Sequence, residues 1–207
     1  MSRYAIFHNK NNKKMIYYPC PKNANTSAKM FLAKHCNVEK EYLFLGDEIP
    51  QVDQTSDHYI GKKNIIKMIP SKQHFEKADV DVKCSIVRDP LKRFISAYKN
   101  RILYHRDPQF NNHSIEMILN KLENNKFENK HFLPQSYFLG DNLDYYTFWA
   151  FTDNLTLFVE KINEFFGRKF DFPKIQTGGS NIDVNLKESE IKRIKKIYSE
   201  DYKLLYK

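Results

Sequence analysis

The sequence predicts an α/β fold: a single domain over residues 1–207, with a central, mainly parallel sheet flanked by helices. Strand patterns alternate with helix patterns along the chain, which is typical of parallel sheets. The length of 207 residues suits one domain and is short for two. Hydrophobic residues make up 41% of the chain and charged residues 29%, which supports a packed core beneath a solvated surface.

The first strand–turn–helix unit occupies the N-terminal part of the chain. Short strands are expected at 6–8 and 15–18 around a polar turn, and prolines end the second strand. A helix is expected over 26–35, because apolar residues recur there at helical spacing. Its N-cap is expected to be one of the three polar residues Asn25, Thr26 and Ser27.

The second unit has the same organisation. Residues 82–87 form an apolar run typical of a buried strand, which ends at Arg88-Asp89-Pro90. An amphipathic helix is expected over 91–103. Asp89 is expected to cap this helix, with Pro90 at its first position.

The rest of the chain is less sharply patterned. Residues 37–58 are acidic and irregular, and 60–74 are mixed, with a short helix expected from Pro70-Ser71. Further along we expect, in order, a loop at 104–112, a helix at 114–122 capped by Ser114, a helix or ordered loop at 131–139, a strand at 145–151, a helix at 155–166 ended by Gly167, a loop at 176–181 and a terminal helix at 188–205.

The net charge of +9 favours an anionic partner, such as nucleic acid, an acidic membrane surface, a polyanionic glycan or a charged cofactor. A solubilising surface explains the same excess. The lysines are scattered and no nucleic-acid motif occurs, so we expect no nucleic-acid partner. Nothing in the sequence indicates an oligomeric state.

Cysteine usage and hydropathy bear on location. The three cysteines fit no metal-binding spacing, which favours reduced thiols in a cytoplasmic setting and predicts no metal site. The N-terminal stretch lacks the apolar core of a signal peptide, and no run of 18 apolar residues occurs. We therefore expect no transmembrane segment.

The polar turn at 21–27 is the first candidate site. A turn that feeds a helix N-terminus presents backbone N–H groups to an anion. Lys22 adds a positive charge, Thr26 and Ser27 add hydroxyls, and Ala24 lets the backbone approach a ligand. An ordinary capped helix explains the same residues. The Walker A pattern is absent, which disfavours a nucleotide kinase-like enzyme.

The second candidate site follows the strand at 82–87. Arg88 comes at the carboxyl end of this strand, where open α/β sheets bind ligands. Ser96 follows two helical turns later, so both side chains are expected to converge on one phosphate. The alternative is that Arg88 pairs with a carboxylate and Ser96 is a surface hydroxyl.

Together these segments resemble the cofactor signature of sulfotransferases that use 3'-phosphoadenosine 5'-phosphosulfate (PAPS). A Pro-Lys-x-x-x-Thr-Ser loop occurs at 21–27, and an Arg-Asp-Pro-x-x-Arg-x-x-Ser-x-Tyr pattern occurs at 88–98. Residues 131–135 are similar to the His-x-x-Pro-Gln segment of Golgi-type carbohydrate sulfotransferases. Residues 151–155 are similar to a segment that usually reads Glu-Asn-Leu, with Asp153 in place of the glutamate.

The resemblance covers roughly residues 15–206 and is weak between 37 and 80. It implies a P-loop-like sulfotransferase fold, with PAPS as co-substrate and no metal. The chain lacks the membrane anchor and paired cysteines of the Golgi enzymes, so it resembles a bacterial-type soluble member. The acceptor implied is a hydroxyl-bearing compound, expected to be a carbohydrate.

The resemblance also implies roles for individual residues. Lys22 is expected to stabilise the bridging oxygen as the leaving group gains charge, and Arg88 with Ser96 to hold the 3'-phosphate. A loop with Gly178 and Gly179 falls where relatives close over the adenosine or 3'-phosphate, although a plain turn explains it equally. The expected donor-binding residues are Lys22, Asn23, Ala24, Asn25, Thr26, Ser27, Arg88, Ser96, Gly178 and Gly179.

A hydroxyl acceptor calls for a general base. His131 is the first candidate, because it lies in the segment that resembles the acceptor side of the family. A structural role, in which it pairs with a backbone carbonyl, is the alternative. His58 is the second candidate and Glu48 the third.

Three other functions are alternatives to sulfuryl transfer. A polyanion- or nucleic-acid-binding protein would use the basic surface, and a nucleotide kinase-like enzyme would need a Walker A loop. A sulfotransferase fold that binds without catalysing would not need Lys22. Trp149 lies among other aromatics and is expected in a core cluster rather than as a sugar platform.

Overall fold

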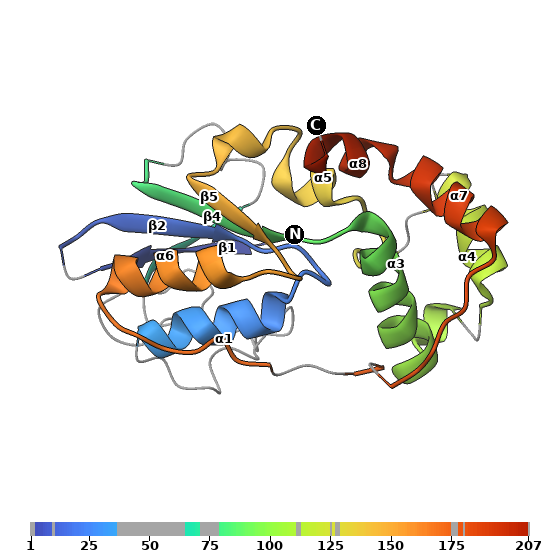
Figure 1. Cartoon of the computed structure of the whole chain (residues 1–207), viewed down its shortest axis with the longest axis horizontal. Coiled ribbons are helices and arrows are strands. Elements are labelled where there is room, and N and C mark those ends of the chain that lie inside the picture. Colours follow the sequence, from blue (N-terminus) through green and yellow to red (C-terminus); the bar gives the residue numbers. More distant parts are fainter. Residues whose placement is uncertain are drawn as a thin grey trace.

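The computed structural model of the chain is an α/β structure built on one five-stranded sheet (Figure 1). It describes residues 3–9, 11–36, 65–70, 79–110, 113–124, 126, 129–174, 178–179 and 181–206. The predicted α/β class with a helix-flanked parallel sheet is confirmed. The assignment of residues 1–207 to one domain stays a prediction.

The sheet has the strand order β3-β1-β2-β4-β5. Strands β2 (Lys14–Tyr18), β4 (Val82–Val87) and β5 (Phe148–Phe151) run parallel to one another. Strand β1 (Arg3–His8) is antiparallel to both of its neighbours, β2 and β3 (Ile65–Pro70). The parallel part therefore consists of three strands, and β1 with β3 extends the sheet beyond β2.

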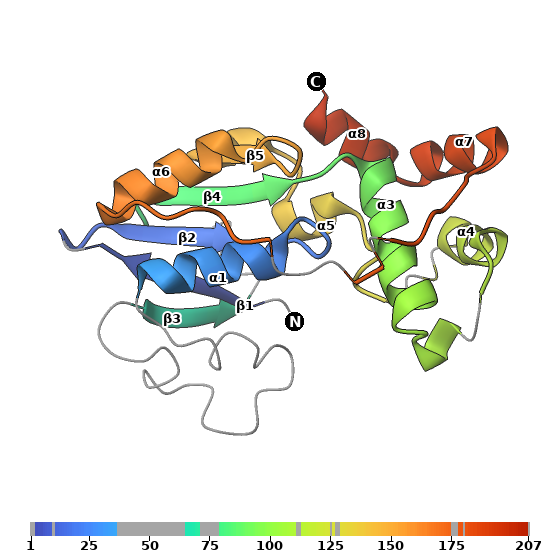
Figure 2. The same cartoon turned by 60° about the horizontal axis from the view of Figure 1, so that its bottom comes forward.

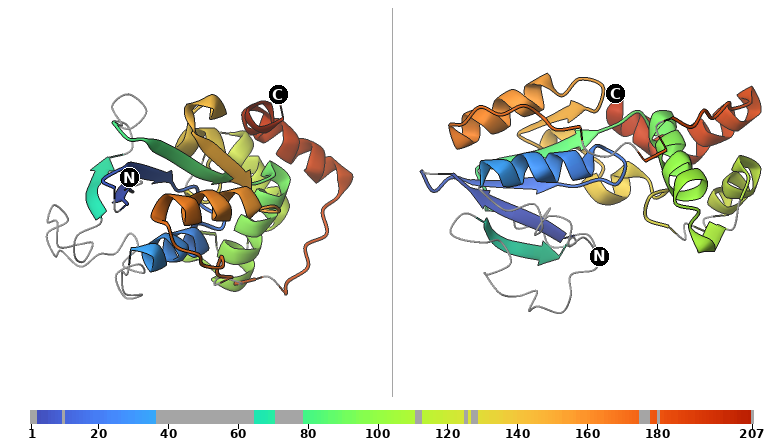
Figure 3. Two further views of the ribbon diagram at one scale, coloured as in Figure 1. Left: turned by 60° about the vertical axis from the view of Figure 1, so that its left-hand side comes forward. Right: turned by 90° about the horizontal axis from the view of Figure 1, so that it is seen from below.

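Helices cover both faces of the parallel strands. Helices α1 (Asn25–His35) and α6 (Thr156–Phe166) lie side by side on one face, as Figures 1 and 3 show. Helices α5 (Gln135–Leu139) and α8 (Ser199–Leu205) pack on the other face. Alternate residues of one strand serve the two cores: Met15 and Tyr17 of β2 face α1, whereas Ile16 and Tyr18 face α5 and α8.

A third cluster forms beyond the carboxyl ends of the strands. It contains α3 (Pro90–Tyr98), α4 (Ile115–Glu123) and α7 (Glu188–Ile197), which Figure 2 shows past the arrowheads of β2 and β4. The predicted caps are confirmed here, since the Asp89 and Ser114 side chains accept bonds from N–H groups of the first helical turn. None of the helices in the described part of the chain is long and apolar enough to cross a membrane.

Several element boundaries differ from the prediction. The N-cap of α1 is Ala24, in a left-handed conformation, so the polar residues expected to cap it lie inside the helix. The helix expected over 91–103 changes to π-helical geometry at Lys99–Tyr104. The terminal helix is broken at Tyr198, whose buried hydroxyl donates to the carbonyl of Phe132 at 2.7 Å.

Other elements are shorter than expected or were missed. Strand β3 lies in the stretch that the sequence left as mixed, and the strand expected over 145–151 is limited to β5. The loop expected at 104–112 contains a 3₁₀ turn at Pro108–Phe110. The helix expected after Pro70 lies outside the described residues.

Candidate functional site

Both candidate segments lie at the carboxyl ends of parallel strands. The loop of residues 19–24 joins β2 to α1, and Arg88 with Asp89 joins β4 to α3. Because β2 and β4 are adjacent and parallel, both connections leave the same edge of the sheet (Figure 2). The two segments whose pairing resembles the donor signature therefore lie at one edge of the sheet.

The first loop has an unusual backbone. Lys22 (φ 70°) and Ala24 (φ 54°) occupy the left-handed region although neither is glycine. Such conformations cost about 1–3 kcal/mol each and persist only where the surroundings enforce them. The side chain of Asn23 supplies part of that enforcement: it is fully buried and donates to the Ile86 carbonyl at 2.9 Å. Asn23 thus fastens the loop to strand β4.

Gln135 joins the two segments through its side chain. Its Oε1 accepts from Asn23 Nδ2 at 2.6 Å and from the Arg88 N–H at 3.0 Å. Its Nε2 donates to the Arg88 carbonyl at 2.7 Å. One buried amide therefore fixes the spacing between the loop after β2 and the end of β4.

Asp201 in turn fixes Gln135. Its carboxylate accepts from the backbone N–H groups of Gln135 at 2.7 Å and Ser136 at 2.9 Å. These groups open helix α5, whose own N-cap residue, Pro134, makes no side-chain capping bond. A fully buried carboxylate from α8 performs that role instead. The C-terminal helix is consequently part of the support of the site.

The arginines of the site are bound by main-chain carbonyls. Arg88 Nη1 donates to Lys22 O at 3.1 Å. Arg93, only 2% exposed, donates to the carbonyls of Pro21 at 2.9 Å and Leu133 at 2.7 Å. Within the described residues neither guanidinium forms an ion pair with a carboxylate, and buried Nε of Arg88 and Nη2 of Arg93 have no hydrogen-bond partner.

These cations act on one another. The pKa of Lys22 is lowered to about 8, first by burial and then by the charges of Arg88, Arg101 and Arg93. Burial also lowers the pKa of Arg88. A partly buried group surrounded by like charges favours its neutral form, and an anion placed among these groups would reverse that effect. The arrangement is suited to binding an anion.

His131 lies within reach of the same charges. Its pKa is lowered to about 3, first by burial and then by the charges of Arg101, Lys22, Lys130 and Arg93. Its ring Nδ1 lies 2.7 Å from Asn129 Oδ1. This partner is a side-chain oxygen rather than the backbone carbonyl considered from the sequence.

Gly178 and Gly179 pack on the end of the helix that carries Ser96. Gly178 O accepts from Asn100 Nδ2 at 3.4 Å, one turn after Ser96. A Cβ on Gly178 would come within 3.0 Å of Asn100, and one on Gly179 within 2.8 Å of the Lys99 carbonyl. Gly179 also has φ +81°, so this position favours glycine.

Some expected residues are placed differently or not described. His58, Glu48, Thr177 and Ser180 lie outside the described residues. Trp149 is half-buried and packs edge-on against Phe151 with ring centroids 5.5 Å apart, within the core cluster favoured from the sequence. Among the described residues, no group of three or more potential metal ligands lies together.

Sequence reasoning missed the supporting residues. Gln135 was inside a recognised segment but had no role assigned, and Arg93 was a motif position without a function. Asp201 was inside a C-terminal segment, 197–202, that also resembles the family but had no role assigned. Asn129 gave no signal, because its partner becomes evident only in three dimensions. Arg101, which pairs with Asp107 at 2.7 Å, looked like any helix-surface arginine.

Comparison with known proteins gives one match. A family model described as "Sulfotransferase family" matches residues 5–207. The match begins within β1 and covers both candidate segments and the C-terminal helices. Neither the curated proteins nor the solved structures gave a match.

Proposed function

Because this chain belongs to the sulfotransferase family, whose members transfer sulfuryl groups, we propose that it moves a sulfuryl group from PAPS to a hydroxyl of a carbohydrate. The observation that carries the choice of donor is the cluster of Lys22, Arg88 and Arg93. These cations meet at the ends of β2 and β4, and the charges that shift the pKa of Lys22 are all positive. A donor with two anionic groups would offset that repulsion.

The residues present fit such a donor. The unpartnered Nε of Arg88 is a buried N–H donor that lacks an acceptor among the described residues. Arg88 and Ser96 would hold the 3'-phosphate. The loop from Lys22 to Ser27 would hold the 5' side, where the N-cap of α1 contributes no competing side-chain acceptor. Gly178 and Gly179 lie against Lys99 and Asn100, just after the helix α3 that carries Ser96.

The donor supplies a sulfuryl group whose transfer leaves negative charge on a phosphate oxygen. We assign Lys22 to stabilising that charge. Its pKa of about 8 leaves the ammonium mostly protonated at neutral pH, and partial burial strengthens its electrostatic effect. Asn23, Gln135 and Asp201 would contribute indirectly, by holding the loop in the conformation that presents Lys22.

We assign the role of general base to His131. It lies close enough to Lys22 for that charge to lower its pKa. His58, which the sequence also nominated, stays a second candidate. The proposed location is the cytoplasm, a setting consistent with three free, buried cysteines.

The test is transfer of radiolabelled sulfate from PAPS onto a panel of neutral and acidic polysaccharides and small sugars. We expect label in a carbohydrate product that glycosidases release, and no labelling when adenosine 5'-phosphosulfate replaces PAPS. Transfer from either donor equally would contradict the 3'-phosphate assignment. Label found only in protein or lipid would contradict a carbohydrate acceptor.

A further inference from the structure

The contact between Asn129 and His131 defines the protonation of the imidazole. Two groups of His131 share Asn129 Oδ1: the backbone N–H at 2.9 Å and ring Nδ1 at 2.7 Å. A backbone N–H can only donate, so the atom it contacts must be the amide oxygen. An oxygen of this kind can only accept, so Nδ1 must carry the ring hydrogen. In the neutral imidazole, Nε2 is then the nitrogen with the free lone pair.

We propose that Asn129 is a positioning residue that holds His131 in the tautomer whose Nε2 accepts the proton of the acceptor hydroxyl. This inference rests on the proposed function, in which His131 is the base. As the acceptor oxygen bonds to sulfur, its proton passes to Nε2. The bond between sulfur and the bridging oxygen breaks, and its electron pair stays on the phosphate. The resulting imidazolium keeps its Nδ1–H bond to Asn129.

The orientation of Asn129 is anchored in the core. The backbone carbonyl of Asn129 accepts from the Phe132 N–H at 3.0 Å, which closes a turn over residues 129–132. The Phe132 ring is buried and packs on Phe94 and Phe110. The Phe132 carbonyl also accepts the Tyr198 hydroxyl. The turn that carries Asn129 is therefore held at Phe132, which is buried in the core.

The surrounding charges make this tautomer useful. Burial is the first cause that lowers the pKa of His131, and the charges of Arg101, Lys22, Lys130 and Arg93 lower it further. Together they keep the ring neutral before the donor binds, so its proton-accepting nitrogen is available. A neutral ring with the opposite tautomer would present an N–H to the acceptor and could not take its proton.

The first test is spectroscopic and needs no activity. In the full chain labelled with ¹⁵N-histidine, the His131 signals are identified by their loss in His131→Gln. We expect the wild type to show protonated Nδ1 and unprotonated Nε2, and Asn129→Ala to shift toward protonated Nε2. Asn124→Ala is the matched control, because among the described residues its amide donates to Asn120 O on α4 and not to His131. A wild type with protonated Nε2, or no shift in Asn129→Ala, would overturn the proposal.

The second test is kinetic. Asn129→Ala should lower kcat by roughly 10²-fold, the lower end of general acid–base contributions, without changing the Kd of 3'-phosphoadenosine 5'-phosphate. Asn129→Asp should regain most of kcat and move the acidic limb of the pH profile to higher pH, because a carboxylate raises the pKa of an adjacent imidazole. A purely structural turn would change thermal stability and leave that limb in place, which would contradict a positioning role.

The two tests separate the possible failures. If His131→Gln keeps full turnover, His131 is not the base and the proposed function needs another one, which overturns the role given to Asn129. If the chain transfers no sulfate at all, the proposed function fails, and the tautomer is still decided by the spectroscopic result.

Discussion

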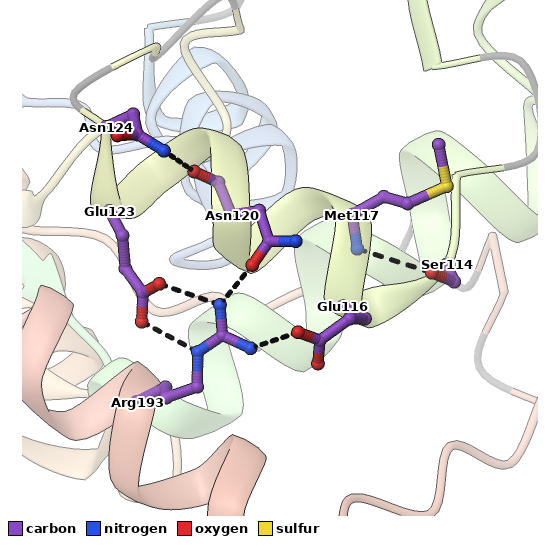
Figure 4. Close-up of polar contacts among 7 residues, drawn as sticks. All are labelled: Ser114, Glu116, Met117, Asn120, Glu123, Asn124 and Arg193. Atoms are coloured by element: carbon purple, nitrogen blue, oxygen red, sulfur yellow. Dashed lines mark hydrogen bonds and ion pairs between the residues drawn. The ribbon is translucent and has the colours of Figure 1, made fainter.

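Arg193, between helices α4 and α7, and Arg88, at the carboxyl end of β4, show two contrasting surroundings for a guanidinium in one molecule. All three nitrogens of Arg193 have acceptors, as Figure 4 shows. Glu123 is bound twice at 2.7 Å, and Glu116 and Asn120 are each bound at 2.6 Å. Hydrogen bonds to Glu123 and Glu116 raise the pKa of Arg193.

The arginines of the candidate site have no such acceptors. Arg88 and Arg93 are held by carbonyls, and each keeps a buried nitrogen without a partner among the described residues. Burial lowers the pKa of Arg88 rather than raising it. Arg193 is thus neutralised by carboxylates of the chain. Arg88, to which we assign a ligand-binding role, has no carboxylate partner among the described residues, and an anionic ligand would offset its charge.

The largest effect is expected from a substitution in the candidate site, and it is a loss of turnover. Lys22→Ala removes the cation assigned to the developing charge, and loss of one such group typically costs 10²–10³-fold in kcat. The affinity for 3'-phosphoadenosine 5'-phosphate should stay within about tenfold, because the Arg88 contact remains. The measurement is sulfate transfer at saturating donor together with calorimetry. Lys161→Ala, which breaks only a surface pair with Glu164, is the control. Unchanged turnover in Lys22→Ala would remove it from the mechanism.

The network beneath the site should matter next. Asp201→Ala leaves the buried N–H groups of Gln135 and Ser136 without acceptors, which should lower the free energy of unfolding by about 2–4 kcal/mol. Asp201→Asn keeps an acceptor oxygen and should cost less. Urea unfolding measures both. Equal stability of Asp201→Ala and the wild type would show that the carboxylate does not hold helix α5.

The structural arginine should have a smaller effect, confined to stability. Arg193→Ala should lower the free energy of unfolding by about 1 kcal/mol, or the Tm by roughly 2–4 °C, because its partners are partly exposed. Lys22→Ala should leave the Tm of the ligand-free protein unchanged or higher, because it removes repulsion. Thermal unfolding of both variants side by side tests the contrast. If Lys22→Ala lowers the Tm and Arg193→Ala does not, the contrast between the two sites is contradicted.

The smallest expected effect is a change in the pKa of His131 when the ligand binds. Binding of 3'-phosphoadenosine 5'-phosphate places negative charge among Lys22, Arg88 and Arg101, so the pKa of His131 should rise from its value of about 3. The sign follows because an added anion favours the protonated imidazole. NMR titration of His131 with and without the ligand measures the change. A pKa that is unchanged or lower would place the anion elsewhere.

The features that depend on neighbouring residues could be predicted from the sequence. Both strand–turn–helix units follow from short-range patterns, and Asp89 and Ser114 cap their helices as their positions predict. The donor-site roles of Lys22 and Arg88 stay predictions, yet the fold brings both residues to one edge of the sheet. Recognising the pairing of two motifs was enough to anticipate that.

The contacts between residues far apart in the sequence could not be predicted. Asp201 contacts Gln135 across 66 positions of sequence, and no periodicity connects a helix start with a distant carboxylate. The left-handed backbone of Lys22 lies next to Asn23, whose bonds to β4 and Gln135 span 63 and 112 positions of sequence, so local propensity gave no sign of it. The break between α7 and α8 likewise falls at Tyr198, within an otherwise continuous helical pattern, and the buried hydroxyl of this residue donates to Phe132 O, 66 positions away.

The 3'-phosphate site proposed at the end of β4 is tested most directly by calorimetric titration of 3'-phosphoadenosine 5'-phosphate into the wild type, Arg88→Ala and Arg193→Ala. We expect binding to the wild type, affinity roughly 10- to 100-fold weaker in Arg88→Ala through loss of charge-assisted hydrogen bonds, and no change in Arg193→Ala. No binding to the wild type, or equal affinity in Arg88→Ala, would contradict the assignment of a 3'-phosphate site at the end of β4.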